Sequence, residues 1–97
     1  MICLHGGSTQ GGVDEAAGRL VGAIERLSTR ARLRLALEND DRCFSAIDLL
    51  PICLATGIPL VLDAHHHRVI TGGLSIEEAT DWALATWGDR EPYFHVS

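Results

Sequence analysis

Short apolar runs alternate with longer amphipathic segments along this chain. After an apolar opening at 2–4 and a Gly-rich turn, the segment 13–27 carries apolar residues at helical spacing. Two more apolar runs follow, each succeeded by an amphipathic segment, and a last apolar run comes near the end of the chain. The predicted strands are 2–4, 33–37, 58–62 and 93–96, and the predicted helices are 13–27, 45–56 and 75–85. The predicted order is therefore βαβαβαβ, which is an α/β fold.

Capping residues support the two later helices. Ser45 is a suitable N-cap for the second helix, and Gly57 is suited to its C-terminal end. Ser75 and Glu78 have the spacing of a capping box for the third helix. The run 58–62 is almost wholly apolar, as expected of a parallel strand that is covered on both faces. Strands that alternate with helices predict a parallel sheet, whose functional groups gather at the carboxyl ends of its strands.

Side chains that bind metal ions stand where the apolar runs stop. They are His5, Glu38, Asp63, His66 and His95. A mixed set of carboxylates and imidazoles suits a catalytic divalent cation such as Mn, Fe or Zn, whereas structural zinc more often uses cysteines. A single histidine is more often a buried or capping residue, so the hypothesis depends on the recurrence. The pattern predicts one shared metal site.

Residues beside these ligands are expected to support them. His65 and His67 flank His66, and we expect at most one of them to reach a metal while the other orients a ligand or packs. Asn39 is a candidate to hydrogen-bond a neighbouring loop. Asn39 and His67 are therefore assigned to the contacts behind the ligands.

Other conspicuous residues have ordinary structural explanations. The glycines of the turn 6–12 lack the GxGxxG spacing, so a flexible turn is favoured over a phosphate cradle. Trp82 and Trp87 are predicted to pack a helix against the sheet. Asp40 and Asp41 are typical of loop or capping acids rather than ligands.

Composition and charge narrow the class of protein. The chain has 97 residues, of which 46% are hydrophobic, and a formal net charge of -5, which fits one small soluble domain. It contains eight arginines and no lysine, so a simple cationic coating of nucleic acid is not expected, and any nucleic-acid role depends on metal ions. Arg42 and Arg68 lie just beyond ligand-bearing strand ends, where a solvated surface arginine is the commoner case.

Cysteine use and the lack of long apolar runs predict a compartment. Cys3, Cys43 and Cys53 are scattered and odd in number, which predicts buried free thiols in a reducing cytosol rather than a disulfide framework. No apolar run approaches the roughly 20 residues that span a bilayer, and no signal-peptide pattern opens the chain. We expect a cytoplasmic protein with no membrane partner.

Several spaced motifs resemble those of the UV damage endonuclease family. They are LALENDDR (35–42), DLLPIC (48–53), TGIPLVLDAHHHR (56–68), TW (86–87) and FHVS (94–97), and they span most of the chain. That family is a metal-dependent TIM barrel that nicks DNA immediately 5′ of ultraviolet photoproducts and some other lesions, which begins excision repair.

The resemblance implies a ligand set, an ion and a reaction. The implied metal ligands are His5, Glu38, Asp63, His66 and His95, with manganese as the ion. The implied reaction is metal-assisted phosphodiester hydrolysis, with Glu38, Asp63 and His66 as catalytic residues and Glu38 or Asp63 as the candidate to bridge two ions. The implied partner is damaged double-stranded DNA, and Arg42 and Arg68 are candidates to contact its phosphates.

The chain departs from the family in two respects. Tyr93 stands two residues before the last histidine, where the family usually has a lysine that can be carboxylated to bridge metals. The family also has strands before His5 and a final strand after Ser97, and these supply further ligands. The resemblance therefore implies that residues 1–97 form one partial domain, about half of a TIM (β/α)8 barrel truncated at both ends, with impaired or no activity in isolation.

Two alternatives remain at this point. The endonuclease IV and xylose isomerase-like barrels share Glu-Asn after one strand and Asp-x-x-His after the next, although the DDR that follows Asn39 favours the UV damage enzyme. The other alternative is a non-catalytic remnant or interaction module that self-associates through the open edges of a half sheet.

Overall fold

The backbone forms a four-stranded parallel sheet with helices packed on one face. The computed structural model describes residues 2–7, 9–40, 43–69 and 71–96. The strands are β1 (Ile2–His5), β2 (Leu35–Glu38), β3 (Leu60–Asp63) and β4 (Phe94–His95), in the spatial order β1-β2-β3-β4. Every neighbouring pair is parallel, so each strand follows its predecessor both in the chain and in the sheet.

Helices connect the strands. They are α1 (Val13–Glu25), α2 (Thr29–Arg32), α3 (Ala46–Thr56), α4 (Ala64–Val69) and α5 (Ile76–Trp87). Ser45 and Ser75 close reciprocal capping boxes with Asp48 and Glu78, which satisfies backbone amides that have no partner inside the helix. Gly57 ends α3 in the left-handed region at φ 75°, a conformation that costs glycine little.

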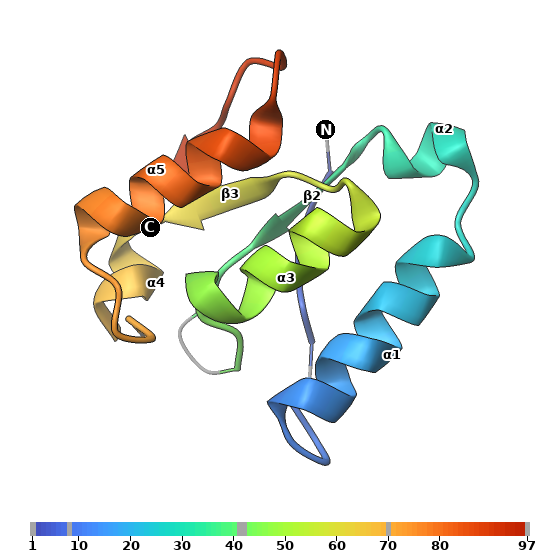
Figure 1. Cartoon of the computed structure of the whole chain (residues 1–97), viewed down its shortest axis with the longest axis horizontal. Coiled ribbons are helices and arrows are strands. Elements are labelled where there is room, and N and C mark those ends of the chain that lie inside the picture. The colour runs from blue at the N-terminus through green and yellow to red at the C-terminus, as the bar shows by residue number, and fades with distance from the viewer. Residues whose placement is uncertain (1, 8, 41–42, 70, 97) are drawn as a thin grey trace.

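The main core lies between the sheet and the three longer helices. Figure 1 shows α3 between α1 and α5 on one face of the sheet, and α3 contacts both of these helices. Leu37, Leu60 and Leu62 point from the strands into this core, where they meet Leu49 and Ile52 of α3. Burial of these apolar side chains supplies most of the stability of the helix–sheet contact.

A smaller cluster lies on the opposite face of the sheet. Ala36 and Val61, which alternate with the core leucines, pack there against Trp87. The indole Nε1 of Trp87 donates a hydrogen bond to the carbonyl of Leu60 at 2.8 Å. The prediction that a tryptophan fixes the helix to the sheet is correct for Trp87. It is wrong for Trp82, whose side chain is half exposed on the outer surface.

The predicted elements are all present, with shorter bounds in several places. The strand expected from 58 begins at Leu60, since Pro59 has no N–H for the sheet and contributes its carbonyl to the amide of Leu37 instead. The helices α2 and α4 were not predicted. Asp63 accepts a hydrogen bond from the amide of His66, which caps the first turn of α4 directly after the strand.

Two further expectations concern the cysteines and the membrane. All three cysteines are free, but only Cys53 is fully buried, whereas Cys3 and Cys43 are partly buried. Burial raises the pKa of the Cys53 thiol to about 12. None of the helices in the described segments is long and apolar enough to cross a membrane.

Candidate metal centre

All four described strands end on a residue that can bind a metal ion. His5 ends β1, Glu38 ends β2, Asp63 ends β3 and His95 ends β4. The strand register pairs His5 with Glu38 and Asp63 with His95. Because the sheet is parallel, its carboxyl ends meet at one edge, and these side chains are brought together there.

The pleat of the sheet decides which face these side chains occupy. Leu37 and Leu62 point toward the helices, so the next residues, Glu38 and Asp63, point to the opposite face. Both carboxylates are nonetheless buried. The candidate centre is therefore on the face without the main helix layer.

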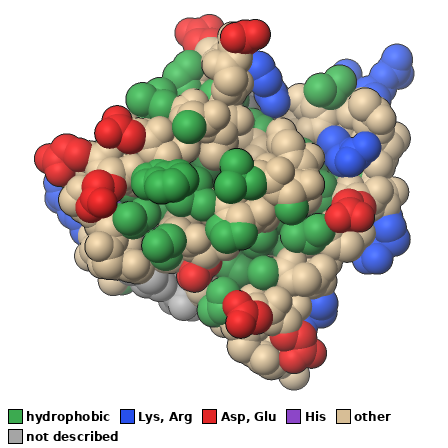
Figure 2. Space-filling view, in the orientation of Figure 1, with side chains coloured by type: hydrophobic (Ala, Val, Ile, Leu, Met, Phe, Trp, Pro, Cys, Tyr) green, Lys and Arg blue, Asp and Glu red, His purple; other side chains and the backbone are tan. Residues whose placement is uncertain are grey.

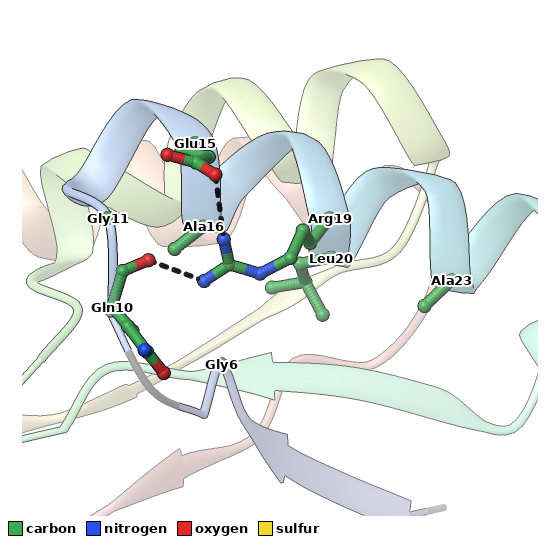
Figure 3. A pocket seen from close by; sticks show the side chains of 8 residues that line it. All are labelled: Gly6, Gln10, Gly11, Glu15, Ala16, Arg19, Leu20 and Ala23. Atoms are coloured by element: carbon green, nitrogen blue, oxygen red, sulfur yellow. Dashed lines mark hydrogen bonds and ion pairs between the residues drawn. The ribbon is translucent and has the colours of Figure 1, made fainter.

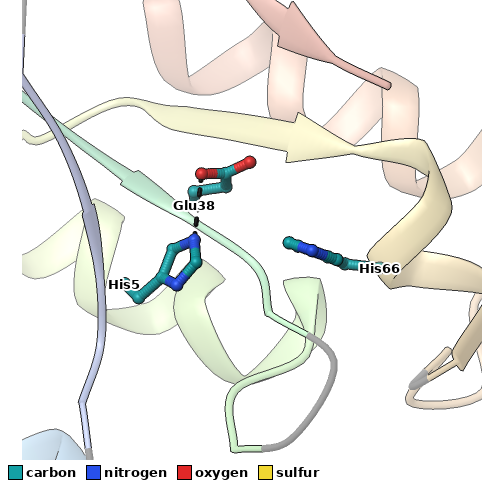
Figure 4. A group of neighbouring side chains, drawn as sticks. All are labelled: His5, Glu38 and His66. Carbon is teal, nitrogen blue, oxygen red and sulfur yellow. Dashed lines mark hydrogen bonds and ion pairs between the residues drawn. The ribbon is translucent and has the colours of Figure 1, made fainter. Parts of the chain in front are cut away.

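Glu38 is at the middle of the centre. Its Oε1 lies 3.1 Å from Nε2 of His5, and its Oε2 lies 2.8 Å from Nδ1 of His95. The carboxylate is almost covered, whereas the side chains of His5 and His95 are 52% and 44% exposed. One buried carboxylate thus joins two half-exposed imidazoles from strands on either side of it. Figure 4 shows His5, Glu38 and His66 converging from separate elements.

Two groups of possible ligand atoms share Glu38. One consists of His5, Glu38 and His66, and the other of Glu38, Asp63 and His95. The ligand atoms within each group lie within 4.8 Å of one another. Nitrogen and carboxylate oxygen at this spacing form a donor set that fits a divalent transition metal, and a carboxylate common to two groups can bridge two ions.

His66 is oriented by its neighbours. Its Nδ1 donates to the main-chain carbonyl of Asn39 at 2.9 Å, and it also lies 3.6 Å from Oδ2 of Asp63. A carbonyl can only accept, so this contact assigns the proton to Nδ1 and the lone pair of the neutral ring to Nε2. A backbone carbonyl behind a histidine is the usual support of a metal-binding imidazole.

Asn39 links the ends of the two central strands. Its Nδ2 donates to the carbonyl of Asp63 at 3.0 Å, and its Oδ1 accepts from the amide of Asp63 at 2.7 Å. The side chain is fully buried. These two bonds hold Glu38 and Asp63 in a fixed relation, while the carbonyl of the same residue positions His66. A neighbouring loop was expected as the partner of Asn39, whereas the observed partner is Asp63, the last residue of β3.

The remaining predicted residues lie away from this cluster or outside the described segments. His67 is buried, but its Nε2 donates to the carbonyl of Leu74, so its hydrogen bond anchors α4 to the turn before α5 and supports no ligand. The expectation that His67 contacts a ligand is therefore corrected. Arg68 is exposed on α4. Arg42 lies outside the described residues, as does Asp41.

Two residues near the centre have structural roles. Asp40 accepts hydrogen bonds from the amides of Cys43 and Phe44, as expected of a loop acid. Tyr93 precedes β4 and packs against the ring of Trp87 at 5.8 Å between centroids.

Cys3, on β1, is affected by the nearby carboxylate of Glu38. Burial, and then the negative charge of Glu38, raise the pKa of the Cys3 thiol.

A separate groove lies between the Gly-rich turn and α1. Figure 3 shows Gly6 and Gly11 beside α1, with Arg19 held between Glu15 and the carbonyl of Gln10. Arg19 donates to that carbonyl at 2.7 Å and lies 3.6 Å from Glu15. The guanidinium is engaged within the protein and a carboxylate stands beside it, which disfavours a phosphate there. The turn conformation follows from positive φ at Gly7, Gly11 and Gly12.

Comparison with known sequences gives consistent matches. The family model for UV-endonuclease UvdE matches residues 1–97. The chain is 46% identical over 97 residues to the UV DNA damage endonuclease of Deinococcus radiodurans, covering 94% of this chain and 30% of that protein. It is 45% identical over 74 residues to the UV-damage endonuclease of Schizosaccharomyces pombe, covering 76% of this chain and 12% of that protein.

Comparison with solved structures agrees with the sequence matches. The crystal structure of SacUVDE superposes with a TM-score of 0.87 at 37% sequence identity, covering 92% of this chain and 31% of that chain. The predicted α/β fold, a part of a TIM barrel, is thereby confirmed. The chain spans well under half the length of these relatives. The chain belongs to the UV-endonuclease UvdE family.

Proposed function

We propose that this chain is the central segment of a DNA repair endonuclease that acts on ultraviolet-damaged double-stranded DNA. The names of its relatives support this activity, and the short span of the chain relative to them supports a partial barrel. The proposed reaction is hydrolysis of the phosphodiester 5′ of a photoproduct. The proposed compartment is the cytoplasm, a reducing environment that is compatible with the three free cysteines.

One observation carries the proposal. Glu38 is a buried carboxylate whose two oxygens face histidines from two different strands, and it belongs to both groups of possible ligands. A buried carboxylate is costly to maintain without cationic partners. We propose that His5, Glu38, Asp63, His66 and His95 hold the divalent metal, with manganese as the first candidate.

Each residue of the proposed centre has its own role in the reaction. The residues of the centre would hold a divalent ion, which would supply polarisation of the scissile phosphate and a lowered pKa of an attacking water. Glu38 and Asp63 would supply the negative charge that binds such an ion, and the two hydrogen bonds from Asn39 to the backbone of Asp63 fix the positions of these carboxylates. His66 presents one nitrogen because the Asn39 carbonyl holds the proton on the other.

The charge of the chain bears on how DNA would bind. At a net charge of -5 the protein repels a polyanion overall, so cations in the centre would offset carboxylates that face the substrate. Arg68, which is exposed on the helix directly after β3, is proposed to contact a phosphate, and Arg42 is proposed for the same role from sequence alone.

The first experiment uses a chimera. Residues 1–97 replace the matching segment of the Deinococcus radiodurans relative, and the isolated chain and a Glu38→Gln chimera are compared with it. We expect the chimera to bind manganese, measured by metal content after dialysis, and to nick irradiated plasmid, and we expect the isolated chain to be impaired. A folded chimera that nicks equally well with Glu38→Gln, or that nicks unirradiated plasmid equally, would contradict the proposal.

The open edges of the sheet favour a second role, self-association. Among the described strands, β1 and β4 each pair with one neighbour only. Unpaired strand edges are templates for pairing with another chain. We propose that the isolated chain self-associates through these edges, which sedimentation velocity at increasing concentration tests directly. A strictly monomeric chain at high concentration would exclude this role.

A further inference from the structure

The outer surface of the helix layer carries an apolar groove between α3 and α5. Its volume is about 290 Å³, and it is lined by Ile47, Leu50, Pro51, Leu54, Leu74 and Trp82. Figure 2 shows hydrophobic side chains gathered over these two helices. Every side chain of the lining is apolar.

Two of the large apolar side chains that line the groove are highly exposed to solvent. The side chain of Leu54 is 73% exposed, and Trp82 is 51% exposed, although both are large apolar groups. Single exposed apolar residues are normal, but a contiguous groove of them marks an interaction site on many proteins. Trp82 in particular is a residue type that is enriched at the energetic centres of interfaces.

The groove is separate from the metal centre and from the strand edges. The two helices cover the sheet with other residues, among them Leu49, Ile52 and Ala83, which are buried in the core. The groove is on the outward side of that layer, whereas Glu38 and Asp63 point to the opposite face of the sheet. Strands that close a barrel pack inside the helices, so they do not cover this surface.

The charges on the two helices indicate what can bind. Asp48 lies on α3, and Glu77, Glu78 and Asp81 lie on α5, while neither helix contains a lysine, an arginine or a histidine. Acidic side chains border the apolar surface in Figure 2. A second copy seated groove to groove would bring these like charges together, whereas a basic partner would be attracted to them.

We propose that this groove binds an amphipathic helix of a protein partner, with an apolar face flanked by lysine or arginine. An amphipathic helix laid into an apolar groove is a recurring mode of recognition, in which anchors one turn apart fill the groove. Trp82 of α5 and Leu54 of α3 line the groove and would contact those anchors. Glu78, one turn before Trp82 on α5, and Asp81, next to Trp82 in the chain, select for basic flanks.

The test uses a synthetic peptide as the probe. A fluorescein-labelled helix of roughly 18 residues, five turns, carries leucine on one face and lysine on its flanks. Two further peptides serve as comparisons: one with the same composition in scrambled order, and one with glutamate in place of lysine. Binding is measured by fluorescence anisotropy against the chain. We expect saturable binding of the first peptide only.

Variants assign the binding to the groove. Trp82→Ala and Leu54→Glu should each weaken binding at least tenfold. Leu33→Glu is the matched control, because Leu33 is 65% exposed and lies outside α3 and α5. Asp81→Asn should weaken binding roughly two- to fivefold, with Asp14→Asn on α1 as its control. Circular dichroism verifies that each variant is folded.

Three outcomes would overturn the proposal. Equal binding of the scrambled or the glutamate peptide would show non-specific apolar adhesion. Unchanged binding with both Trp82→Ala and Leu54→Glu would move the site elsewhere. A dimer in sedimentation velocity that Trp82→Ala dissociates would identify a second copy as the occupant.

Discussion

The two faces of the sheet are stabilised by different kinds of interaction. On the helix face, Leu37, Leu60 and Leu62 are buried in a continuous apolar core. On the other face, Ala36 and Val61 pack on one tryptophan, and two residues further along each strand the same face carries the carboxylates Glu38 and Asp63. The first face is stabilised by burial, and the second is arranged by a few directed hydrogen bonds. One strand thus contributes to stability with alternate residues and to the candidate centre with the others.

The comparison predicts its largest effect on the apolar face. Leu37→Ala removes a fully buried side chain next to Glu38 and should lower the free energy of unfolding by about 2–5 kcal/mol. Urea denaturation measures this change. Manganese affinity of the remaining folded protein should stay within a few-fold, since no ligand is altered. A large loss of manganese affinity in a fully folded Leu37→Ala variant would show that packing on the helix face affects the candidate centre on the other face.

Glu38→Gln should have the opposite profile. The substitution keeps the shape of the side chain and removes its charge, so manganese affinity should fall at least about 100-fold, which is roughly 2.7 kcal/mol. The free energy of unfolding should change by about 1 kcal/mol or less, because both histidine partners are half exposed and water can solvate them. Isothermal titration with manganese and urea denaturation give the two numbers, and unchanged affinity would remove Glu38 from the centre.

Asn39→Ala should affect both properties moderately. The variant loses two hydrogen bonds to the backbone of Asp63 and leaves buried groups without partners, which should cost about 1–3 kcal/mol of unfolding free energy. Manganese affinity should fall roughly 10- to 100-fold, because Glu38, Asp63 and His66 lose their common support. Ser45→Ala, which removes a helix cap in the same core, is the control and should change stability alone.

The smallest effect concerns Cys53 and pH. Burial raises the pKa of this thiol from 9.0 to about 12, so the folded state disfavours the thiolate. The stabilisation is complete below pH 9 and is lost as the pH rises toward 12, with a loss of about 1.4 kcal/mol by pH 10. The difference in unfolding free energy between wild type and Cys53→Ala, followed from pH 8 to about pH 10, isolates this contribution. A difference that does not vary with pH would contradict it.

Sequence patterns predicted most elements because their signals are local. The apolar run before Asp63 and the caps Ser45 and Ser75 depend on neighbours a few residues away. The helices α2 and α4 have only 4 and 6 residues, too few for a helical period to be visible. The pattern also did not separate Trp82 from Trp87, which are about 140° apart around α5 and therefore face solvent and sheet respectively.

The sequence by itself determined which residue types end the strands, because the first three apolar runs stop at a histidine or a carboxylate and the last contains a histidine. Only the tertiary structure decided how these residues meet. Glu38 reaches His5 across 33 residues and His95 across 57 residues, distances in the chain that only the parallel register closes. The same holds for His66, whose proton is placed by a main-chain carbonyl that no side-chain pattern reveals, and for His67, whose bond to Leu74 turns it away from the centre. Local sequence propensity determines whether a segment forms a helix or a strand, but long-range hydrogen bonds determine which atoms face one another.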